Sequence, residues 1–432
     1  MNKSDSERIA RILEKMGYKK AKKEEIPDII VVNMCSVRQS AVDRVYGLTQ
    51  RLKKLKTRNP KLKTILTGCI LKEDRKKFAE KFDLILNIKD LKNWPRFIKK
   101  ATAGKSLLSQ SCYNSGEYLK IRPKYQNRFS VFIPISTGCN NACTYCAVPF
   151  TRGPLICREA EDILKEAREA VKKGAKEIWL LGQNVNDYCS KPKIKNQKSK
   201  IINFARLLEM IDKIKGNFWI RFTSPNPADF SKKLIETMAR CKKITPYLNL
   251  PVQSGDDKIL KKMNRRYTVK EYKKLVKKIR SAFRRYRKGL EKEIALSTDV
   301  IVGFPGETKK QFQNTAKLLK EIRFDMAYIA RYSPRPGTGA EKMKDNVSDK
   351  EKRRREEELT KILRKTILAR NKKFIGKTIE VLAEKNKNDY ILGKSRHFKT
   401  VRFKGGKALI GNFVKIKITK VQPFGLEGKI SS

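Results

Sequence analysis

The stretch Gly138-Cys139-Asn140-Asn141-Ala142-Cys143-Thr144-Tyr145-Cys146 carries the strongest chemical signal in the chain. Its three cysteines are separated by three and then by two residues, and it follows an apolar run over residues 131–136 that predicts a buried strand. In barrels of alternating strands and helices, the loops at the carboxyl ends of the strands hold the active site. The sequence therefore predicts a functional loop of three thiols at the top of such a barrel.

Three thiols in one short loop favour an iron–sulfur cluster. Soft sulfur ligands suit iron, and three of them leave the fourth iron of a cubane open. An open iron can chelate the amino and carboxylate groups of S-adenosylmethionine. Two alternatives stay open: three buried thiols without a metal, and a zinc site, for which Cys157 is the only nearby fourth ligand.

The segment around this loop alternates strands and helices. Six such units within residues 129–340 indicate a (β/α) barrel, and an incomplete one, since a full barrel has about eight. We assign the barrel domain to residues 125–345. The predicted strands are 131–136, 177–181, 219–223, 247–252, 295–302 and 325–331.

Residues 1–100 predict a separate domain with a doubly wound parallel sheet, because short apolar runs alternate with helical patterns. Strands are expected at 28–33, 64–68 and 84–86. Cys35 and Cys69 each follow a strand, so both should lie at the carboxyl edge of the sheet. The chain opens on a helix, whereas such a sheet normally opens on a strand, so we expect this domain to be truncated at its first strand.

The C-terminal part changes character. A highly charged helix is predicted to link the domains over residues 346–374, and residues 375–432 read as a small β-barrel of short β-branched runs. Residues 375–430 hold 13 basic and 4 acidic residues, a net charge of +9. Small basic β-barrels are common RNA-binding modules.

The composition of the whole chain points to a polyanionic partner. Lys and Arg total 102 against 44 Asp and Glu, a net charge of +58, which raises affinity for nucleic acids. No apolar run is long enough to span a membrane, and the polar N-terminus is no secretory signal. We therefore expect a monomeric cytoplasmic protein that binds nucleic acid and does not contact a membrane.

Cysteine and histidine usage limits the possible chemistry. Nine cysteines in a cytoplasmic chain argue against disulfides, and the only histidine, His397, excludes a histidine-based metal site or a Ser–His pair. We expect His397 to be an ordinary surface residue. Cys157, Cys189 and Cys241 are expected to be buried thiols without a ligand role, and Cys112 lies in a connector.

The three-cysteine motif resembles that of the radical-SAM superfamily, and further stretches along the whole chain resemble its methylthiotransferases. The C-terminal barrel resembles their RNA-binding TRAM domain. The sequence contexts at 35–38 and 263–268 are most similar to members that act on isopentenyl-adenosine in tRNA. The matching stretches are residues 33–38, 67–69, 148–153, 181–186, 221–224, 250–255, 262–267, 299–307 and 332–338.

The resemblance implies two [4Fe-4S] clusters and S-adenosylmethionine as cofactors. Cys139, Cys143 and Cys146 would hold the cluster that cleaves S-adenosylmethionine, with an electron from a flavodoxin or ferredoxin type of donor. The resulting radical would take hydrogen from C2 of isopentenyl-adenosine beside the anticodon. A second cluster on Cys35 and Cys69 would present sulfur, from an unidentified donor, and a second S-adenosylmethionine would supply the methyl group.

Seven further residues are candidate cofactor contacts, with ordinary barrel packing as the alternative for each. Tyr145 lies inside the thiol loop and is expected to pack on the adenosyl group. The others lie near predicted strand ends: Gly182 and Gln183 for the amino-acid part, Asp299 and Gly303 for the adenine, and Arg221 and Gln253 facing the cavity.

The chain departs from the family at its N-terminus. The family's first domain uses three cysteines, and Cys35 and Cys69 are the only two here, since Met1 aligns two residues after the missing one. We hypothesise that the native chain starts about ten residues upstream, the length of a strand and its turn. N-terminal sequencing of the native protein tests this hypothesis, and a native chain that starts at Met1 contradicts it. With two cysteines, the second cluster should be labile.

Three alternatives remain for the function. A methylthiotransferase of this family could act instead on ribosomal protein S12 or on threonylcarbamoyl-adenosine in tRNA, although the context after Cys35 argues against both. A non-catalytic RNA-binding protein is the alternative from another class. Cleavage of S-adenosylmethionine by the reconstituted protein would separate an enzyme from a binding module.

Overall fold

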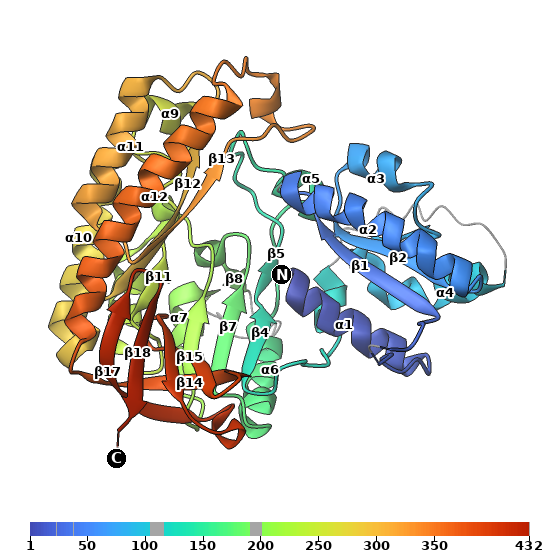
Figure 1. Cartoon of the computed structure of the whole chain (residues 1–432), viewed down its shortest axis with the longest axis horizontal. Coiled ribbons are helices and arrows are strands. Elements are labelled where there is room, and N and C mark those ends of the chain that lie inside the picture. Colours follow the sequence, from blue (N-terminus) through green and yellow to red (C-terminus); the bar gives the residue numbers. More distant parts are fainter. Residues whose placement is uncertain (23, 38, 104–115, 191–200, 432) are drawn as a thin grey trace. The chain divides into compact units, whose positions relative to one another are not determined.

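The computed structural model describes residues 1–22, 24–37, 39–103, 116–190 and 201–431 (Figure 1). The chain divides into two compact units. The first comprises Met1–Gln126, Pro134–Arg158 and Ser333–Lys342 and contains the three-thiol loop. The second comprises Asn127–Ile133, Glu159–Tyr332 and Met343–Ser432. Cys112 lies outside the described residues.

The first unit is built on a parallel sheet in the order β1-β2-β3, as the alternating pattern predicts. The strands are β1 (Ile29–Cys35), β2 (Lys63–Cys69) and β3 (Leu84–Ile85). The register pairs Cys35 with Cys69, so the two cysteines are the last residues of neighbouring strands. The expected meeting of both thiols at one sheet edge is confirmed.

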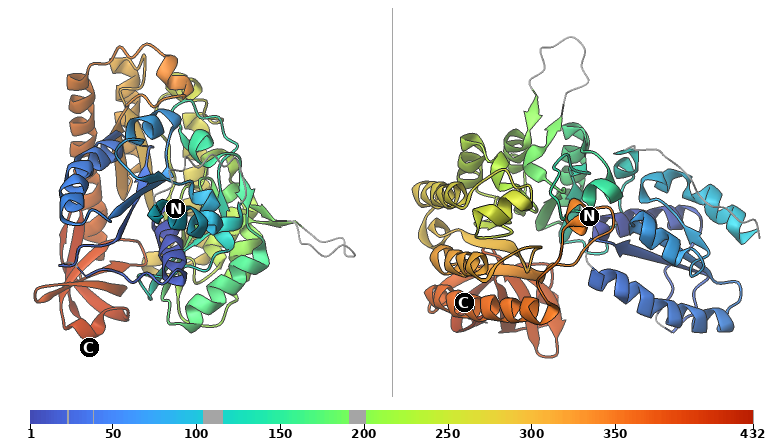
Figure 2. Two further views of the ribbon diagram at one scale, coloured as in Figure 1. Left: turned by 90° about the vertical axis from the view of Figure 1, so that its right-hand side faces the viewer. Right: turned by 90° about the horizontal axis from the view of Figure 1, so that it is seen from above.

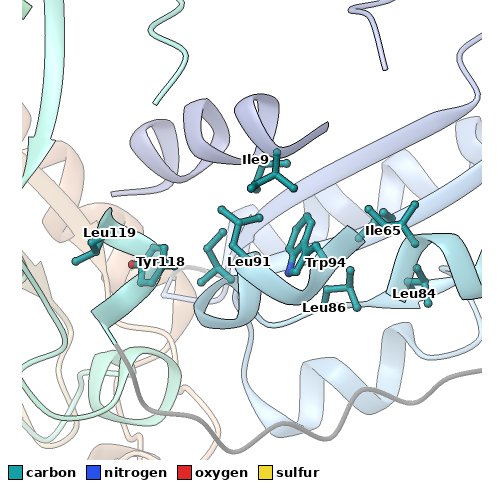
Figure 3. Close-up of a cluster of buried hydrophobic side chains, with 11 residues drawn as sticks. Ile9, Ile65, Leu84, Leu86, Leu91, Trp94, Tyr118 and Leu119 are labelled. Atoms are coloured by element: carbon teal, nitrogen blue, oxygen red, sulfur yellow. The ribbon is translucent and has the colours of Figure 1, made fainter. Parts of the chain in front are cut away.

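Helices cover both faces of this sheet because its side chains alternate with period two. On one face, Val31 and Ile65 pack with α1 (Asn2–Lys15) and α4 (Trp94–Thr102) around the buried Trp94 (Figure 3). On the other face, Val32 and Leu66 pack with α2 (Gln39–Arg58) and α3 (Lys72–Phe78). The doubly wound arrangement is thus present in the described chain.

Short elements from distant parts of the chain complete the first unit. Strands β5 (Ser136–Thr137) and β6 (Ile156–Cys157) form an antiparallel pair around the thiol loop, and α5 (Val148–Arg152) lies between them in sequence. The strand predicted over 131–136 is therefore interrupted at Ile135. The 3-10 helices of this unit are η1 (Ile88–Asn93), η2 (Gly116–Lys120) and η6 (Gly339–Lys342).

The second unit contains the six predicted barrel strands as two three-stranded sheets, in the orders β10-β7-β4 and β11-β12-β13. A parallel bridge between Ile220 and Ile244 connects the two, so they continue one open barrel wall. The strands are β4 (Ser130–Pro134), β7 (Glu177–Leu181), β10 (Trp219–Phe222), β11 (Tyr247–Asn249), β12 (Ala295–Val302) and β13 (Met326–Arg331).

Helices pack outside the barrel strands. Two of them begin with a capping box: Thr268 with Glu271 at α10, and Thr308 with Gln311 at α11, which fixes where these helices start. The helices are α6 (Ala160–Lys172), α7 (Phe204–Asp212), α8 (Lys232–Arg240), α9 (Asp257–Lys262), α10 (Val269–Tyr286) and α11 (Lys309–Ile322). The minor elements are β8 (Cys189–Ser190), β9 (Ile202–Asn203), η3 (Val185–Asp187), η4 (Pro227–Asp229) and η5 (Gly289–Lys292).

The charged helix α12 (Asp349–Asn371) leads into a closed five-stranded barrel in the order β14-β15-β16-β18-β17 (Figure 2). Alternate residues such as Val381 and Ile416 fill its core, and intervening lysines face solvent. The predicted small β-barrel is confirmed. Its elements are η7 (Lys372–Phe374), β14 (Thr378–Lys387), β15 (Tyr390–Ser395), β16 (Thr400–Lys404), η8 (Lys407–Leu409), β17 (Phe413–Gln422) and β18 (Gly425–Ile430).

Two predictions about burial are wrong. His397 is not a surface residue: it is 6% exposed, and its Nε2 lies 3.1 Å from the carbonyl oxygen of Leu290. Of the three cysteines expected to be buried, Cys189 is exposed and Cys157 and Cys241 are half-buried. Both errors arise because tertiary packing, and not residue type alone, decides burial.

Candidate active site

The thiol loop starts at a position that only glycine can occupy. Gly138 has φ +78°, and a Cβ there would lie 1.9 Å from the carbonyl oxygen of Pro154. The next residue is fixed by a hydrogen bond from the amide of Cys139 to the carbonyl oxygen of Gly153 at 3.1 Å. The two ends of the loop are thus held together at their base.

Backbone and amide N–H groups point at the sulfurs of Cys139 and Cys146. The Sγ of Cys139 accepts hydrogen bonds from the backbone N and the Nδ2 of Asn141, at 3.4 and 3.5 Å. The Sγ of Cys146 accepts one from the backbone N of Val148 at 3.5 Å. N–H donors of this kind stabilise thiolates that bind a cluster.

The donor chemistry of this loop fits an iron–sulfur cluster. All three thiols are half-buried and come from eight consecutive residues, and the amide of Cys146 donates to the carbonyl oxygen of Cys143 at 3.0 Å. In the described part of the chain, no three His, Cys, Asp or Glu side chains are grouped as a ready-made metal site. The loop nevertheless offers three soft sulfur ligands within one short segment.

A second segment of the same unit supports the middle of the loop. The amide of Ala340 donates to the carbonyl oxygen of Thr144 at 2.7 Å, and a Cβ at Gly339 would touch the Thr144 side chain at 3.6 Å. Tyr145 beside it is half-buried. Contact between Tyr145 and a cofactor stays a prediction.

The edge of the N-terminal sheet presents two more thiols. Cys69 is buried and Cys35 is half-buried, and the amide of Ser36 donates to the carbonyl oxygen of Cys69 at 2.7 Å. Gly68, with φ +107°, lies so close to Met34 that a Cβ would be 2.2 Å from its carbonyl oxygen. The two strand ends are therefore in close contact.

Arg152 ties this sheet edge to the thiol loop. Its side chain is 1% exposed, and its Nε donates to the Sγ of Cys69 at 2.9 Å. One terminal nitrogen donates to the Oδ2 of Asp5 at 2.6 Å and to the Oδ1 of Asn2 at 3.1 Å, and the other donates to the hydroxyl of Tyr118 at 3.1 Å. The residue six positions after Cys146 thus binds directly to a thiol of the other set.

Burial controls the electrostatics of this network. The hydrogen bond with Cys35, together with burial, raises the pKa of the Cys69 thiol well above its ordinary value, and Arg152 opposes this rise. Burial lowers the pKa of Arg152, but Asp5, Cys69 and Tyr118 together raise it well above its ordinary value, so the guanidinium stays charged. Burial also raises the pKa of Tyr118 to about 12, so its hydroxyl stays protonated.

In the second unit, strand β7 ends at Leu181, and the predicted contacts Gly182 and Gln183 follow directly. The Oε1 of Gln183 is buried and has no hydrogen-bond partner. A buried acceptor without a partner is costly, and a ligand ammonium group would satisfy it. This orphaned oxygen fits the predicted role of Gln183 toward the amino-acid part of S-adenosylmethionine.

Gln253 and Asp299 lie next to each other, but Asp299 lies within β12 and not at its end. The amide of Gln253, in a left-handed conformation with φ +69°, donates to the carbonyl oxygen of Asp299 at 2.8 Å. The Oδ2 of Asp299 accepts from the Nδ2 of Asn249 at 3.0 Å. A left-handed non-glycine residue is a strained position and is common at functional sites.

Gly303 follows β12 and is required for packing. It has φ +69°, and a Cβ would lie 2.3 Å from the Cγ of Lys352. Its amide donates to the Oε2 of Glu307 at 2.7 Å, and the same carboxylate pairs with Arg355 at 2.7 Å. Burial raises the pKa of Glu307.

Arg221 has a different environment from the one expected. It is buried within β10 and pairs with Glu177 at 2.5 Å. It also donates to the carbonyl oxygens of Ser395 and Arg396, at 2.8 and 2.9 Å, and lies 5.1 Å from the ring of Phe398. The guanidinium therefore anchors the C-terminal barrel to the strands, and a cofactor contact for Arg221 stays a prediction.

No role for Arg152 or Asp5 could be predicted from local sequence patterns. Arg152 stands in a family-like stretch, and its basic charge just after the three cysteines was the only available signal. Asp5 lies 147 residues away in sequence, and no local pattern connects it to Arg152.

Among the described residues, no helix is both long and apolar enough to cross a membrane.

Comparison with known protein families divides the chain into three matches. The Radical SAM superfamily matches residues 133–319, and the TRAM domain matches residues 372–431. The uncharacterized protein family UPF0004 matches residues 1–87. The [4Fe-4S] cluster and S-adenosylmethionine implied by the first match agree with the three-thiol loop.

Two curated relatives extend over nearly the whole chain. A tRNA-2-methylthio-N(6)-dimethylallyladenosine synthase from Clostridium novyi is 39% identical over 100% of this chain and 94% of its own length. The enzyme of that name from Carboxydothermus hydrogenoformans is 40% identical over 99% of this chain and 96% of its own length.

A solved structure shares the fold. The radical S-adenosylmethionine methyltransferase TsrM from Kitasatospora setae has a TM-score of 0.53 and 12% identity, over 78% of this chain and 73% of its own. Identity this low supports the fold alone. The full-length relatives and the three domain matches together show that this chain belongs to the radical-SAM methylthiotransferases, the family of the tRNA-2-methylthio-N(6)-dimethylallyladenosine synthases.

Proposed function

We propose that this enzyme converts N6-isopentenyl-adenosine beside the anticodon of tRNA to its 2-methylthio derivative. The reaction replaces the hydrogen at C2 of the base by a methylthio group. The observation that carries the proposal is the full-length likeness, at 39% identity, to a relative named for this product. The basic C-terminal barrel and the net charge of +58 suit a tRNA substrate.

We assign three domains and a linker to this task. Residues 1–100 form the N-terminal methylthiotransferase domain, and residues 125–345 form the radical-SAM barrel. Residues 346–374 form the linking helix, and residues 375–432 form the RNA-binding TRAM barrel. The family matches to residues 1–87, 133–319 and 372–431 support these boundaries.

Cys139, Cys143 and Cys146 are the proposed ligands of the first cluster. When bound, such a cluster supplies the electron that cleaves S-adenosylmethionine. The N–H groups of Asn141 and Val148 hold the sulfurs of Cys139 and Cys146 as hydrogen-bonded acceptors. Gln183 offers a buried acceptor for an ammonium group, and Tyr145, Gly182, Gln253, Asp299 and Gly303 stay candidate contacts.

Cys35 and Cys69 are the proposed ligands of a second [4Fe-4S] cluster, which would supply sulfur. Their pairing at neighbouring strand ends supports this assignment. Arg152 donates to the sulfur of Cys69 and would orient that thiolate. Within residues 1–100, Cys35 and Cys69 are the two cysteines that could serve as ligands.

The remaining partners follow from the same proposal. We propose an electron donor of the flavodoxin or ferredoxin type and a separate sulfur donor. We also propose that the enzyme works as a monomer in the cytoplasm, where its tRNA substrate is found.

Mass spectrometry of tRNA nucleosides tests the function. The protein is expressed in a strain that lacks its own methylthiotransferase, and 2-methylthio-isopentenyl-adenosine should appear. Persistence of unmodified isopentenyl-adenosine contradicts the proposal. A Cys143→Ala variant should leave isopentenyl-adenosine unmodified and serves as the matched negative control.

A second measurement separates an enzyme from an RNA-binding module. Under anaerobic conditions and with a strong reductant, the reconstituted protein should cleave S-adenosylmethionine to 5′-deoxyadenosine. Cleavage without tRNA modification would favour another substrate, such as ribosomal protein S12 or threonylcarbamoyl-adenosine. No cleavage would favour a non-catalytic RNA-binding protein.

A further inference from the structure

A pocket in the second unit lies where the first residues of β11 and β13 meet the C-terminal barrel and the end of α12. Tyr247 and Tyr328 line it from the strands, Asn371 from the helix, and Lys394, Phe398 and Phe424 from the barrel. Its volume is 160 Å³. Sites for drug-sized ligands have about 300–1,000 Å³, so this pocket suits a single ring system.

Two aromatic side chains of the pocket are open to solvent. Tyr328 on β13 is 40% exposed, and Phe424 is 49% exposed at the two-residue turn between β17 and β18. Large apolar rings are usually covered by the protein's own core. Exposed rings on a basic surface are instead typical of platforms on which unpaired bases stack.

Asn371 supplies an unused hydrogen-bond acceptor. Its side chain is 1% exposed, and its Nδ2 donates to the carbonyl oxygens of Gln422 and Pro423, at 2.8 and 3.2 Å. These two bonds fix the orientation of the amide, and the Oδ1 is left buried without a partner. Every nucleobase carries an amino or imino N–H that could donate to such an oxygen.

The charges around the pocket favour a polyanion. The carboxylate of Asp325 is neutralised by Lys399 and Arg370, each at 2.8 Å. Lys394 lies over the ring of Phe398 at 4.7 Å, and Arg364 lies 5.7 Å from the ring of Phe424. The cations therefore outnumber the carboxylate, which suits the phosphates that flank a bound base.

We propose that this pocket binds one unpaired nucleobase of the RNA substrate, a different base from the one that is modified. The pocket lies at the amino ends of β11 and β13, whereas the candidate contacts Gly182 and Gln183 follow the carboxyl end of β7. Gly182 and Gln183 thus lie at the opposite strand end from the pocket, while Tyr328 pairs in register with Asp299 on the neighbouring strand. This inference rests on the proposed tRNA substrate.

Fluorescence of 2-aminopurine tests the pocket. The probe is an RNA stem-loop containing isopentenyl-adenosine, with 2-aminopurine placed at each other unpaired loop position in turn. Stacking on Phe424 or Tyr328 should quench one position when wild-type protein binds. Phe424→Ala should abolish that quenching and weaken binding roughly 5- to 150-fold, the range that corresponds to the loss of one base–aromatic stack.

The matched control is Ile430→Ala. Ile430 is 48% exposed on the same C-terminal barrel and does not line the pocket, so its removal should change affinity less than twofold. Tyr328→Ala should repeat the effect of Phe424→Ala from the opposite chain segment. Because neither variant removes a charge, the salt dependence of binding should keep its slope.

The outcomes separate the two proposals. If wild-type protein binds the stem-loop and no loop position loses quenching in either aromatic variant, the pocket proposal is wrong and the proposed function stands. If wild-type protein does not bind the stem-loop at all, both fall. Each variant should unfold at the same temperature as the wild type. A loss of binding then does not come from a loss of folding.

Discussion

At the scale of single residues, removal of the Arg152 charge should strongly reduce the stability of the first unit. It neutralises the fully buried carboxylate of Asp5 at 2.6 Å, so Arg152→Met would leave a buried charge without a partner. Breaking one side of a buried ion pair typically costs about 3–5 kcal/mol of unfolding free energy. Urea unfolding followed by circular dichroism should show a loss of this size.

Two further variants complete this test. Arg152→Lys keeps the charge and should recover part of the stability, but not the hydrogen bond to Cys69. Lys92→Met breaks an exposed pair with Glu117 and should cost less than about 1 kcal/mol. Equal losses for Arg152→Met and Lys92→Met would show that the buried pair contributes nothing special.

Site residues with partners nearby in the sequence could be predicted, and those with distant partners could not. The ligand roles of Cys139, Cys143 and Cys146 were proposed from local spacing. Cys35 and Cys69 were placed together because parallel strands end at one edge. The contacts of Arg221 with Ser395 and Arg396 could not be predicted, because these partners lie 174 and 175 residues further along the chain.

At the scale of elements, the turn between β15 and β16 carries a buried titratable group. Burial lowers the pKa of His397 to about 4, from an ordinary value of 6.5. The fold thus favours the neutral ring, and the unfolded chain takes up the proton first as the pH falls. The neutral His397 ring contributes its full stabilisation of the folded protein above pH 6.5. This contribution is lost as the pH falls from 6.5 to 4, and the total loss in unfolding free energy is about 3 kcal/mol.

NMR provides a direct measurement, because His397 is the only histidine. The imidazole signal of the folded protein should keep its neutral position down to pH 5. In urea unfolding, the stability difference between wild type and His397→Gln should shrink as the pH falls from 7 to 4.5. A titration midpoint near 6.5 would mean that the ring is hydrated in the folded protein.

Elements with a strong periodic pattern were predicted well, and short ones were not. Strands β7 and β12 begin and end where expected, because apolar and β-branched residues dominate both segments. The pair β5 and β6 has two residues in each strand and exists through the closure of the thiol loop. Such elements depend on tertiary hydrogen bonds, which no window of sequence contains.

At the scale of the whole molecule, the excess of positive charge should dominate RNA binding. Lys415 and Lys417 point outward from β17, where they alternate with the buried Val414, Ile416 and Ile418. Each phosphate contact that is lost reduces the slope of log affinity against log salt by about 0.7–0.9. If both lysines contact phosphates, the double variant Lys415→Gln and Lys417→Gln should reduce the slope by about 1.4–1.8.

This prediction concerns where on the chain the charge acts, so its control removes the same charge elsewhere. Lys53 and Lys54 are exposed on α2 in the first unit, and changing both to Gln lowers the net charge equally. Filter binding of tRNA across a salt series should show a smaller slope for the β17 pair and an unchanged slope for the α2 pair. Equal slopes for both variants would mean that net charge alone, and not the C-terminal barrel, attracts the RNA.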